Sequence, residues 1–183
     1  MNLVSGKVTE MTADDDLKEK NKKKAFVISD EKGISLVTPG SSEGKMWDET
    51  GVDNARLSAD GKYVIYSKDV LITPMNGTDI YKDLPKTTLQ AYTDLNYRHW
   101  DTWEDGKYSH VFLLEVATGN KIDLMAGEPY DCPQKPFGGA EDFMFTPDGK
   151  GVVYVTKKKV GKEYAQSTNT DIYHYDIATG KTT

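Results

Sequence analysis

The sequence predicts an all-β protein built from consecutive antiparallel sheets, and two repeated patterns lead to this prediction. The first is the recurrence of SADGKYVIY (58–66) as TPDGKGVVY (146–154). A third Asp-Gly-Lys lies between them at 105–107, so that the intervals between the aspartates are 45 and 43 residues. Repeats of this length are typical of the four-stranded blades of a β-propeller.

The second pattern is an alternating apolar segment that runs into a glycine. It occurs as HVFLLEVATGNK (110–121), as DIYHYDIATGK (171–181) and more loosely as AFVISDEKG (25–33). Alternation with period two is typical of a strand with one buried face, and the glycine supplies the positive φ of a tight turn. Each of these segments is therefore predicted to form a β-hairpin.

These patterns divide the chain into three blade units, at about 1–54, 55–139 and 140–183. The first unit is expected to hold a strand at Lys7–Met11 and a hairpin over 25–38. The second carries a long insertion over 74–109 with the aromatic cluster YRHWDTW (97–103), and long structured loops often carry function. We therefore expect a partial propeller of about three four-stranded antiparallel blades, of the WD40 or TolB kind.

A propeller ring usually needs at least four blades, because an open array leaves blade faces and strand edges unpaired. With about three units, the chain is expected to be a piece of a larger propeller or to close its ring by association.

Composition narrows the classes of function. The 23 basic and 29 acidic side chains give a net charge of −6, which argues against nucleic acid as the main partner. We find neither an apolar stretch of the roughly 20 residues that span a bilayer nor a signal peptide pattern, so we expect no membrane association. The lone Cys132 excludes an internal disulfide and a multi-cysteine zinc site, and we expect no cofactor. Whether a parent protein is periplasmic or cytoplasmic stays open.

Several catalytic or metal-binding patterns have simpler explanations. Gly40–Gly44 matches the G-x-S-x-G pattern of a nucleophile elbow. Such an elbow at Ser42 needs a helix directly after it, but residues 45–51 are poor helix formers, so we interpret the segment as a polar loop. The three histidines, His99, His110 and His174, lack metal-ligand spacing. Asp-Gly-Lys is a turn signal rather than a calcium loop, and Asn76-Gly77-Thr78 is as well explained by a turn as by glycosylation.

Loop carboxylates are the remaining candidates. Glu141 follows the small residues Gly138, Gly139 and Ala140, which allow a ligand close to the backbone, and Glu128 precedes a proline-rich bend. A partly buried carboxylate needs a cationic partner, and the ammonium group of a ligand can supply it. The alternative is that both are ordinary solvated acids.

A series of motifs carries a family resemblance over residues from about 55 to the end. The motifs are DIYxDLP (79–85), YRHWDxW (97–103), YSH (108–110), GEPY (127–130), GGAE (138–141), PDGK (147–150) and STNTDIY (167–173). With these motifs in this order, the chain resembles the N-terminal propeller of bacterial dipeptidyl-peptidase and acylaminoacyl-peptidase members of the prolyl oligopeptidase family of serine peptidases.

The resemblance implies a propeller that caps an α/β-hydrolase domain, restricts access to short peptides and holds the free amino terminus of the substrate through acidic loop residues. The catalytic domain is absent from this chain, so no catalytic residue is expected here. We assign amino-terminal binding to Glu141, with Tyr97, Arg98 and Asn169 as nearby substrate contacts. The expected partners are therefore short peptide substrates, which this segment meets by way of the missing catalytic domain. The alternative is a free-standing binding or scaffold module that forms a homo-oligomer through its exposed blade edges.

Overall fold

The computed structural model describes residues 24–41, 44–94, 97–99 and 101–183, and for His99 the backbone alone. The expected strand at Lys7–Met11 and the loop residue Ser42 lie outside these ranges. Within them the chain forms three main antiparallel sheets in sequence order and a small two-stranded one, which confirms the all-β prediction.

The first sheet has the strand order β1 (Phe26–Asp30), β2 (Gly33–Val37) and β3 (Lys45–Trp47). The predicted hairpin is present, since β1 and β2 pair from Phe26 with Val37 to Asp30 with Gly33. In the described residues this blade therefore has three strands.

The other two main sheets are four-stranded meanders. One consists of β4 (Val52–Leu57), β5 (Tyr63–Leu71), β8 (Lys107–Glu115) and β9 (Lys121–Asp123). The other consists of β10 (Phe143–Phe145), β11 (Gly151–Thr156), β12 (Asp171–Asp176) and β13 (Lys181–Thr182). The limits of the three blade units, as distinct from these strands, stay a prediction.

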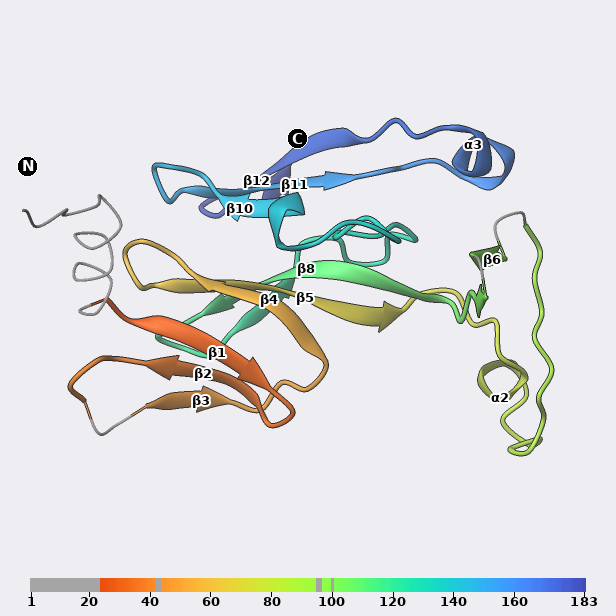
Figure 1. Ribbon diagram of the computed structural model, residues 1–183, viewed down its shortest axis with the longest axis horizontal. Helices are drawn as coiled ribbons and strands as arrows, with labels where there is room; N and C mark the ends of the chain where they lie inside the picture. Colours follow the sequence, from red (N-terminus) through yellow and green to blue (C-terminus); the bar gives the residue numbers. More distant parts are fainter. Residues whose placement is uncertain (1–23, 42–43, 95–96, 100) are drawn as a thin grey trace, which may run out of the picture.

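Figure 1 shows the three sheets as stacked layers, with the β4–β9 sheet in the middle. Successive side chains of its strand β5 belong to two different hydrophobic cores. Val64 and Tyr66 pack in one core with Ile34 of the first sheet, whereas Ile65 packs in the other with Val152 of the third. A sheet buried on both faces needs apolar residues on both, which explains the continuous run of valine, isoleucine and tyrosine in this strand. Stacking of this kind is how propeller blades bury their faces.

Two of the three Asp-Gly-Lys segments form the expected turns between the first and second strands of a sheet. Asp60 and Asp148 accept hydrogen bonds from the amides of Lys62 and Lys150, at 3.2 and 3.1 Å. The hydroxyl of Ser58 donates to Asp60 as well, and these bonds hold the pKa of that carboxyl at about 2. Both carboxylates therefore accept hydrogen bonds within their own turns.

The third segment, 105–107, forms the same local turn, with the amide of Lys107 donating to Asp105 at 3.0 Å, but it was wrongly counted as the equivalent position in its blade. It enters β8, the third strand of its sheet, and closes the long insertion instead. The turns that occupy equivalent places in their sheets are therefore those at Asp60 and Asp148. The whole sequence interval between these two residues is one blade repeat, because the insertion lengthens the second blade.

The insertion contains α2 (Gly77–Ile80) and the two-stranded sheet of β6 (Arg98–His99) and β7 (Thr102–Trp103). In Figure 1 it lies at one end of the layers, near α3 (Gly161–Gln166), which connects β11 to β12. In the described part of the chain, no helix has the length and apolarity to cross a lipid bilayer.

Candidate functional site

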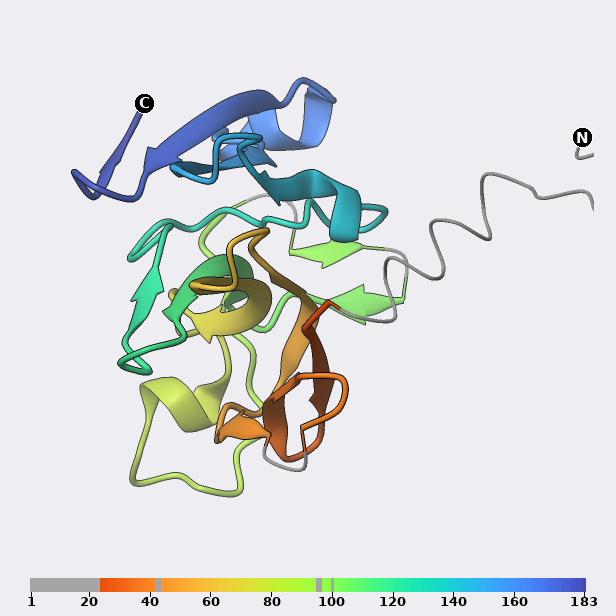
Figure 2. The same cartoon turned by 90° about the vertical axis from the view of Figure 1, so that its left-hand side faces the viewer.

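All four predicted site residues lie at the same end of the stacked sheets. Glu141 lies in the short turn before β10, Tyr97 and Arg98 lie between β5 and β8, and Asn169 lies between β11 and β12. Because the sheets are antiparallel meanders, the start of the first strand and the connection between the second and third strands share one end. The Asp60 and Asp148 turns lie at the opposite end, as Figures 1 and 2 show.

Glu141 is the exposed central residue of a single 3₁₀ turn, η1 (Ala140–Asp142). Arg56 of β4 holds this turn from below: its guanidinium donates to the carbonyl of Ala140 and, at 3.3 Å, to that of Phe143. The same guanidinium lies 5.9 Å from the centre of the Phe143 ring. Arg56 is therefore a positioning residue that fixes the Glu141 backbone against the neighbouring blade.

The segment that leads to η1 is folded tightly around Asp142. The Asp142 carboxylate accepts a hydrogen bond of 2.8 Å from the amide of Gln134. A Cβ on Gly138 would lie 2.1 Å from the same carboxylate and 2.4 Å from the Gln134 nitrogen, so only glycine fits there. The small residues noted in the sequence thus serve backbone packing at Gly138.

Asn169 belongs to a connection that is tied to the Gln134 segment. The side-chain amide of Gln134 donates to the hydroxyl of Tyr164 at 3.0 Å. The ammonium group of Lys157 donates to the carbonyls of Tyr164 and Ser167, at 3.0 and 3.1 Å. These bonds order the connection, while the Asn169 side chain is exposed.

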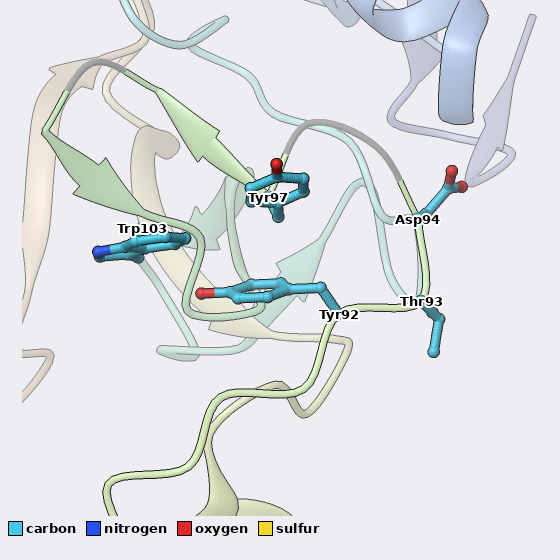
Figure 3. Close-up of a pocket in the computed structure, with 5 residues that line it drawn as sticks. All are labelled: Tyr92, Thr93, Asp94, Tyr97 and Trp103. Carbon is cyan, nitrogen blue, oxygen red and sulfur yellow. The ribbon is translucent and has the colours of Figure 1, made fainter.

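Tyr97 and Arg98 belong to an aromatic cluster on the insertion. The ring of Tyr97 lies 5.6 Å from that of Tyr92 and 6.1 Å from that of Trp103, measured between centroids. The Arg98 guanidinium lies 5.3 Å from the centre of the Trp103 ring. Figure 3 shows these rings around an open hollow of about 430 Å³, which Thr93 and Asp94 also line.

The structure brings the four residues to one end of the sheets, where Tyr97 and Arg98 are neighbours in the chain. Among the described residues, no hydrogen bond, ion pair or ring contact joins Glu141 to the other three. Figure 1 shows β6 beside α3 at the end of the molecule, whereas the chain around residue 140 lies close to the sheets. Their assignment as one substrate site stays a prediction.

Glu128, the second carboxylate considered from the sequence, already has a protein partner. One carboxylate oxygen, Oε1, forms an ion pair with the ammonium group of Lys158, whereas Oε2 is buried and has no hydrogen-bond partner among the described residues. The hypothesis that a ligand ammonium pairs with Glu128 therefore stays a prediction. Glu128 and Lys158 belong to different connections, and their sequence separation gave no sign of the pairing.

A buried histidine and aspartate pair was missed from the sequence. His110 is completely buried, with Nδ1 2.9 Å from the Asp123 carboxylate and Nε2 2.9 Å from the Glu128 carbonyl. Burial alone would lower the pKa of His110, but the hydrogen bond to Asp123 raises it above its usual range. The described residues contain no group of three or more His, Cys, Asp or Glu side chains that could hold a metal ion.

The stacked meanders and the buried middle sheet define this chain as a segment of a β-propeller. No protein-family model matches it. The dipeptidyl-peptidase 5 of Porphyromonas gingivalis is 41% identical over 135 residues, which cover 72% of this chain and 19% of the relative. That of Porphyromonas endodontalis is 42% identical over 137 residues, covering 73% and 19%.

A probable dipeptidyl-peptidase 5 of Emericella nidulans is 28% identical over 210 residues, which cover 96% of this chain and 27% of the relative. The TolB crystal structure from Acinetobacter baumannii covers 89% of this chain with a TM-score of 0.44 and 16% identity. The chain is thus homologous to a segment of dipeptidyl-peptidase 5, which agrees with the dipeptidyl-peptidase resemblance of its motifs, and it spans about one fifth of the length of the two Porphyromonas relatives.

Proposed function

We propose that this chain is the non-catalytic propeller portion of a serine peptidase of the prolyl oligopeptidase family, of the dipeptidyl or acylaminoacyl type. In this role it gates access of short peptides to a catalytic domain and helps to bind the free amino terminus of the substrate. Homology to dipeptidyl-peptidase 5 at 41% identity is the observation that carries the proposal.

Glu141 is the residue that we assign to the amino terminus. It is exposed, it stands at the end of the sheets where the long connections gather, and Arg56 and Asp142 hold its backbone in place. A carboxylate selects a free amino terminus because a blocked or internal residue offers no ammonium and leaves the acid without its charge-assisted hydrogen bond. Tyr97, Arg98 and Asn169 are proposed as further contacts from neighbouring connections.

The test places this chain in the P. gingivalis dipeptidyl-peptidase 5 in place of the segment that it matches. We expect Glu141→Gln to lower kcat/KM for a dipeptide 4-nitroanilide by roughly 10- to 100-fold, because a hydrogen bond to a charged group is worth about 1.5–3 kcal/mol. The slow hydrolysis of the N-acetylated substrate should not change.

Glu163→Gln is the matched control, since Glu163 is another exposed acid at the same end, on α3. It should leave both rates unaltered. Equal rates for the parent chimaera and Glu141→Gln would contradict the role of Glu141, and a chimaera without any peptidase activity would contradict the propeller role itself.

A second candidate is a scaffold module whose copies close a ring, and the outer faces of the two end sheets favour it. On the first sheet Phe26, Ile28 and Met46 are exposed, with Met46 at 59%. On the third sheet Met144 and Ile172 are exposed, with Ile172 at 73%. Apolar sheet faces of this kind usually pack against another surface.

If copies of this chain close a ring, sedimentation velocity should show one discrete symmetric oligomer that Ile172→Lys dissociates to monomer. Val160→Lys is the control, because Val160 is exposed but lies outside the sheets. A monomer, or an oligomer that resists Ile172→Lys, would contradict this second candidate.

A further inference from the structure

The insertion contains the one Asn-Gly pair of the sequence, Asn76-Gly77, at the start of α2 and away from the three main sheets in Figure 1. In spontaneous deamidation, the backbone nitrogen of the following residue attacks the side-chain amide carbon of the asparagine. A glycine hinders this attack least, because it has no side chain beside its nitrogen. Whether Asn76 reacts in the fold therefore depends on whether these two atoms can meet.

The folded insertion keeps the two atoms apart. Asn76 has φ of −78° and ψ of 142°, an extended conformation that turns the Gly77 nitrogen away from the Asn76 side chain. Closure of the succinimide ring needs both on the same side of the bond between the Cα and the carbonyl carbon. The Gly77 amide also donates a hydrogen bond of 2.6 Å to the Leu89 carbonyl, which holds the proton that the attacking nitrogen must lose.

A second segment of the insertion fixes this conformation. Asn76 forms an antiparallel bridge with Gln90, and the Ala91 amide donates to the Met75 carbonyl at 2.8 Å. Gly77 itself is buried. Rotation of the peptide group between Asn76 and Gly77 breaks this pairing, so the reaction requires local opening of the insertion.

Packing at Thr87 explains why a glycine follows the asparagine. A Cβ on Gly77 would lie 2.7 Å from Thr87 Cγ2 and 3.1 Å from the Leu89 carbonyl oxygen, so a larger residue does not fit. The Thr87 hydroxyl also accepts a hydrogen bond of 3.2 Å from the Leu89 amide. The glycine that favours deamidation is thus required by the same contacts that prevent it.

The products of deamidation do not fit the closed insertion. The side-chain amide of Asn76 donates to the Asp79 carboxylate at 3.3 Å. A carboxylate in place of that amide cannot donate, and it repels Asp79. The isoaspartate product also adds one carbon to the main chain, which puts the paired segments out of register.

We propose that Asn76 is a deamidation site that is protected in the folded insertion, reacts when the insertion opens, and then keeps it open. In the open form the Gly77 nitrogen attacks Asn76 Cγ, the bond from Cγ to Nδ2 breaks, and Nδ2 leaves as ammonia with the amide proton. Water then opens the succinimide at either carbonyl and gives aspartate or isoaspartate. Opening is thereby recorded as a permanent negative charge on the insertion, whatever the function of the whole protein.

The test is peptide mapping by mass spectrometry, which locates the conversion of the amide to an acid during incubation under mildly alkaline conditions. We expect Asn76 to react at least about 10-fold more slowly in the folded chain than in the same chain unfolded in guanidinium chloride, because only open molecules react. Thr87→Ala should raise the rate in the folded chain by roughly 3- to 10-fold, since it removes a hydrogen bond that orders Leu89. In the unfolded chain it should change nothing.

Thr88→Ala is the matched control, because Thr88 is the exposed neighbour of Thr87 and its side chain forms no hydrogen bond with a residue that the structure describes. It should react at the rate of the parent chain. Equal rates in the folded and the unfolded chain, or equal rates for the two threonine variants, would overturn the protection.

Asn76→Asp tests the effect of the product. We expect amide hydrogen exchange at Gly77 to become roughly 3- to 10-fold faster, because the hydrogen bond to Asp79 is replaced by repulsion. Asn120→Asp is its control, since it adds the same charge to an exposed turn at the other end of the sheets. Unchanged exchange at Gly77 in Asn76→Asp would refute the claim that the product keeps the insertion open.

Discussion

Gly106→Ala is expected to lower the free energy of unfolding by about 3 kcal/mol or more, a large fraction of the stability of an ordinary domain. The residue has φ of +82°, and an added Cβ would lie 1.7 Å from the carbonyl oxygen of Thr73. The carbonyl of Gly106 also accepts hydrogen bonds from Ile72 and Thr73 at 3.0 and 3.1 Å, which close the base of the insertion. Urea denaturation of parent and variant measures the loss.

The variant Gly127→Ala separates the energetic cost of the steric contact at Gly106 from the cost of the left-handed backbone conformation. Gly127 has φ of +77°, close to that of Gly106, but a Cβ there meets no atom within 4 Å. Only the cost of the left-handed conformation remains, about 1 kcal/mol. Equal losses for the two variants would contradict the close approach at Thr73. Because Gly106 closes the insertion, its variant should also disturb the Trp103 indole signal.

The second large effect is a pH dependence of stability that arises at His110. Both ring nitrogens face acceptors, the Asp123 carboxylate and the Glu128 carbonyl, so both must donate and the folded state holds the ring protonated. Burial opposes the charge, but the bond to Asp123 raises the pKa of His110 above the usual histidine value of 6.5. His110 therefore stabilises the fold fully below about pH 6.5, and this stabilisation is lost as the pH rises through the folded pKa.

We expect His110→Leu to lower the free energy of unfolding by about 2–4 kcal/mol at pH 6, since the variant removes the cationic partner of the partly buried Asp123, which keeps only the hydrogen bond from the Met125 amide. The difference from the parent should shrink at pH 9. Urea denaturation at both pH values measures it, and the ¹⁵N shifts of the His110 ring report its protonation directly.

His174→Gln is the control for this dependence, because His174 forms no ion pair with any residue that the structure describes. Its variant should keep the pH dependence of the parent chain. A difference between His110→Leu and the parent that stays constant from pH 6 to pH 9 would contradict a protonated His110 in the fold.

The interactions between the sheets could not be read from local pattern. Arg56 and Ala140 are far apart in the sequence, as are His110 and Glu128, and each pair meets only because a strand residue lies against a connection that follows much later in the chain. The third Asp-Gly-Lys shows the same limit. Its residues match those of the other two, but its place in the sheet depends on which strands pair around it.

The sequence by itself determined the all-β class, the hairpins and the resemblance to the propeller of dipeptidyl-peptidases, because alternation with period two, turn glycines and motif order are properties of neighbouring residues. Only the tertiary structure decided that Glu128 pairs with Lys158, that Arg56 holds the Glu141 turn, and that Tyr92 joins Trp103 around the hollow. Each of these contacts joins residues that are not neighbours in the sequence, and the pairing and stacking of the strands are what bring them together.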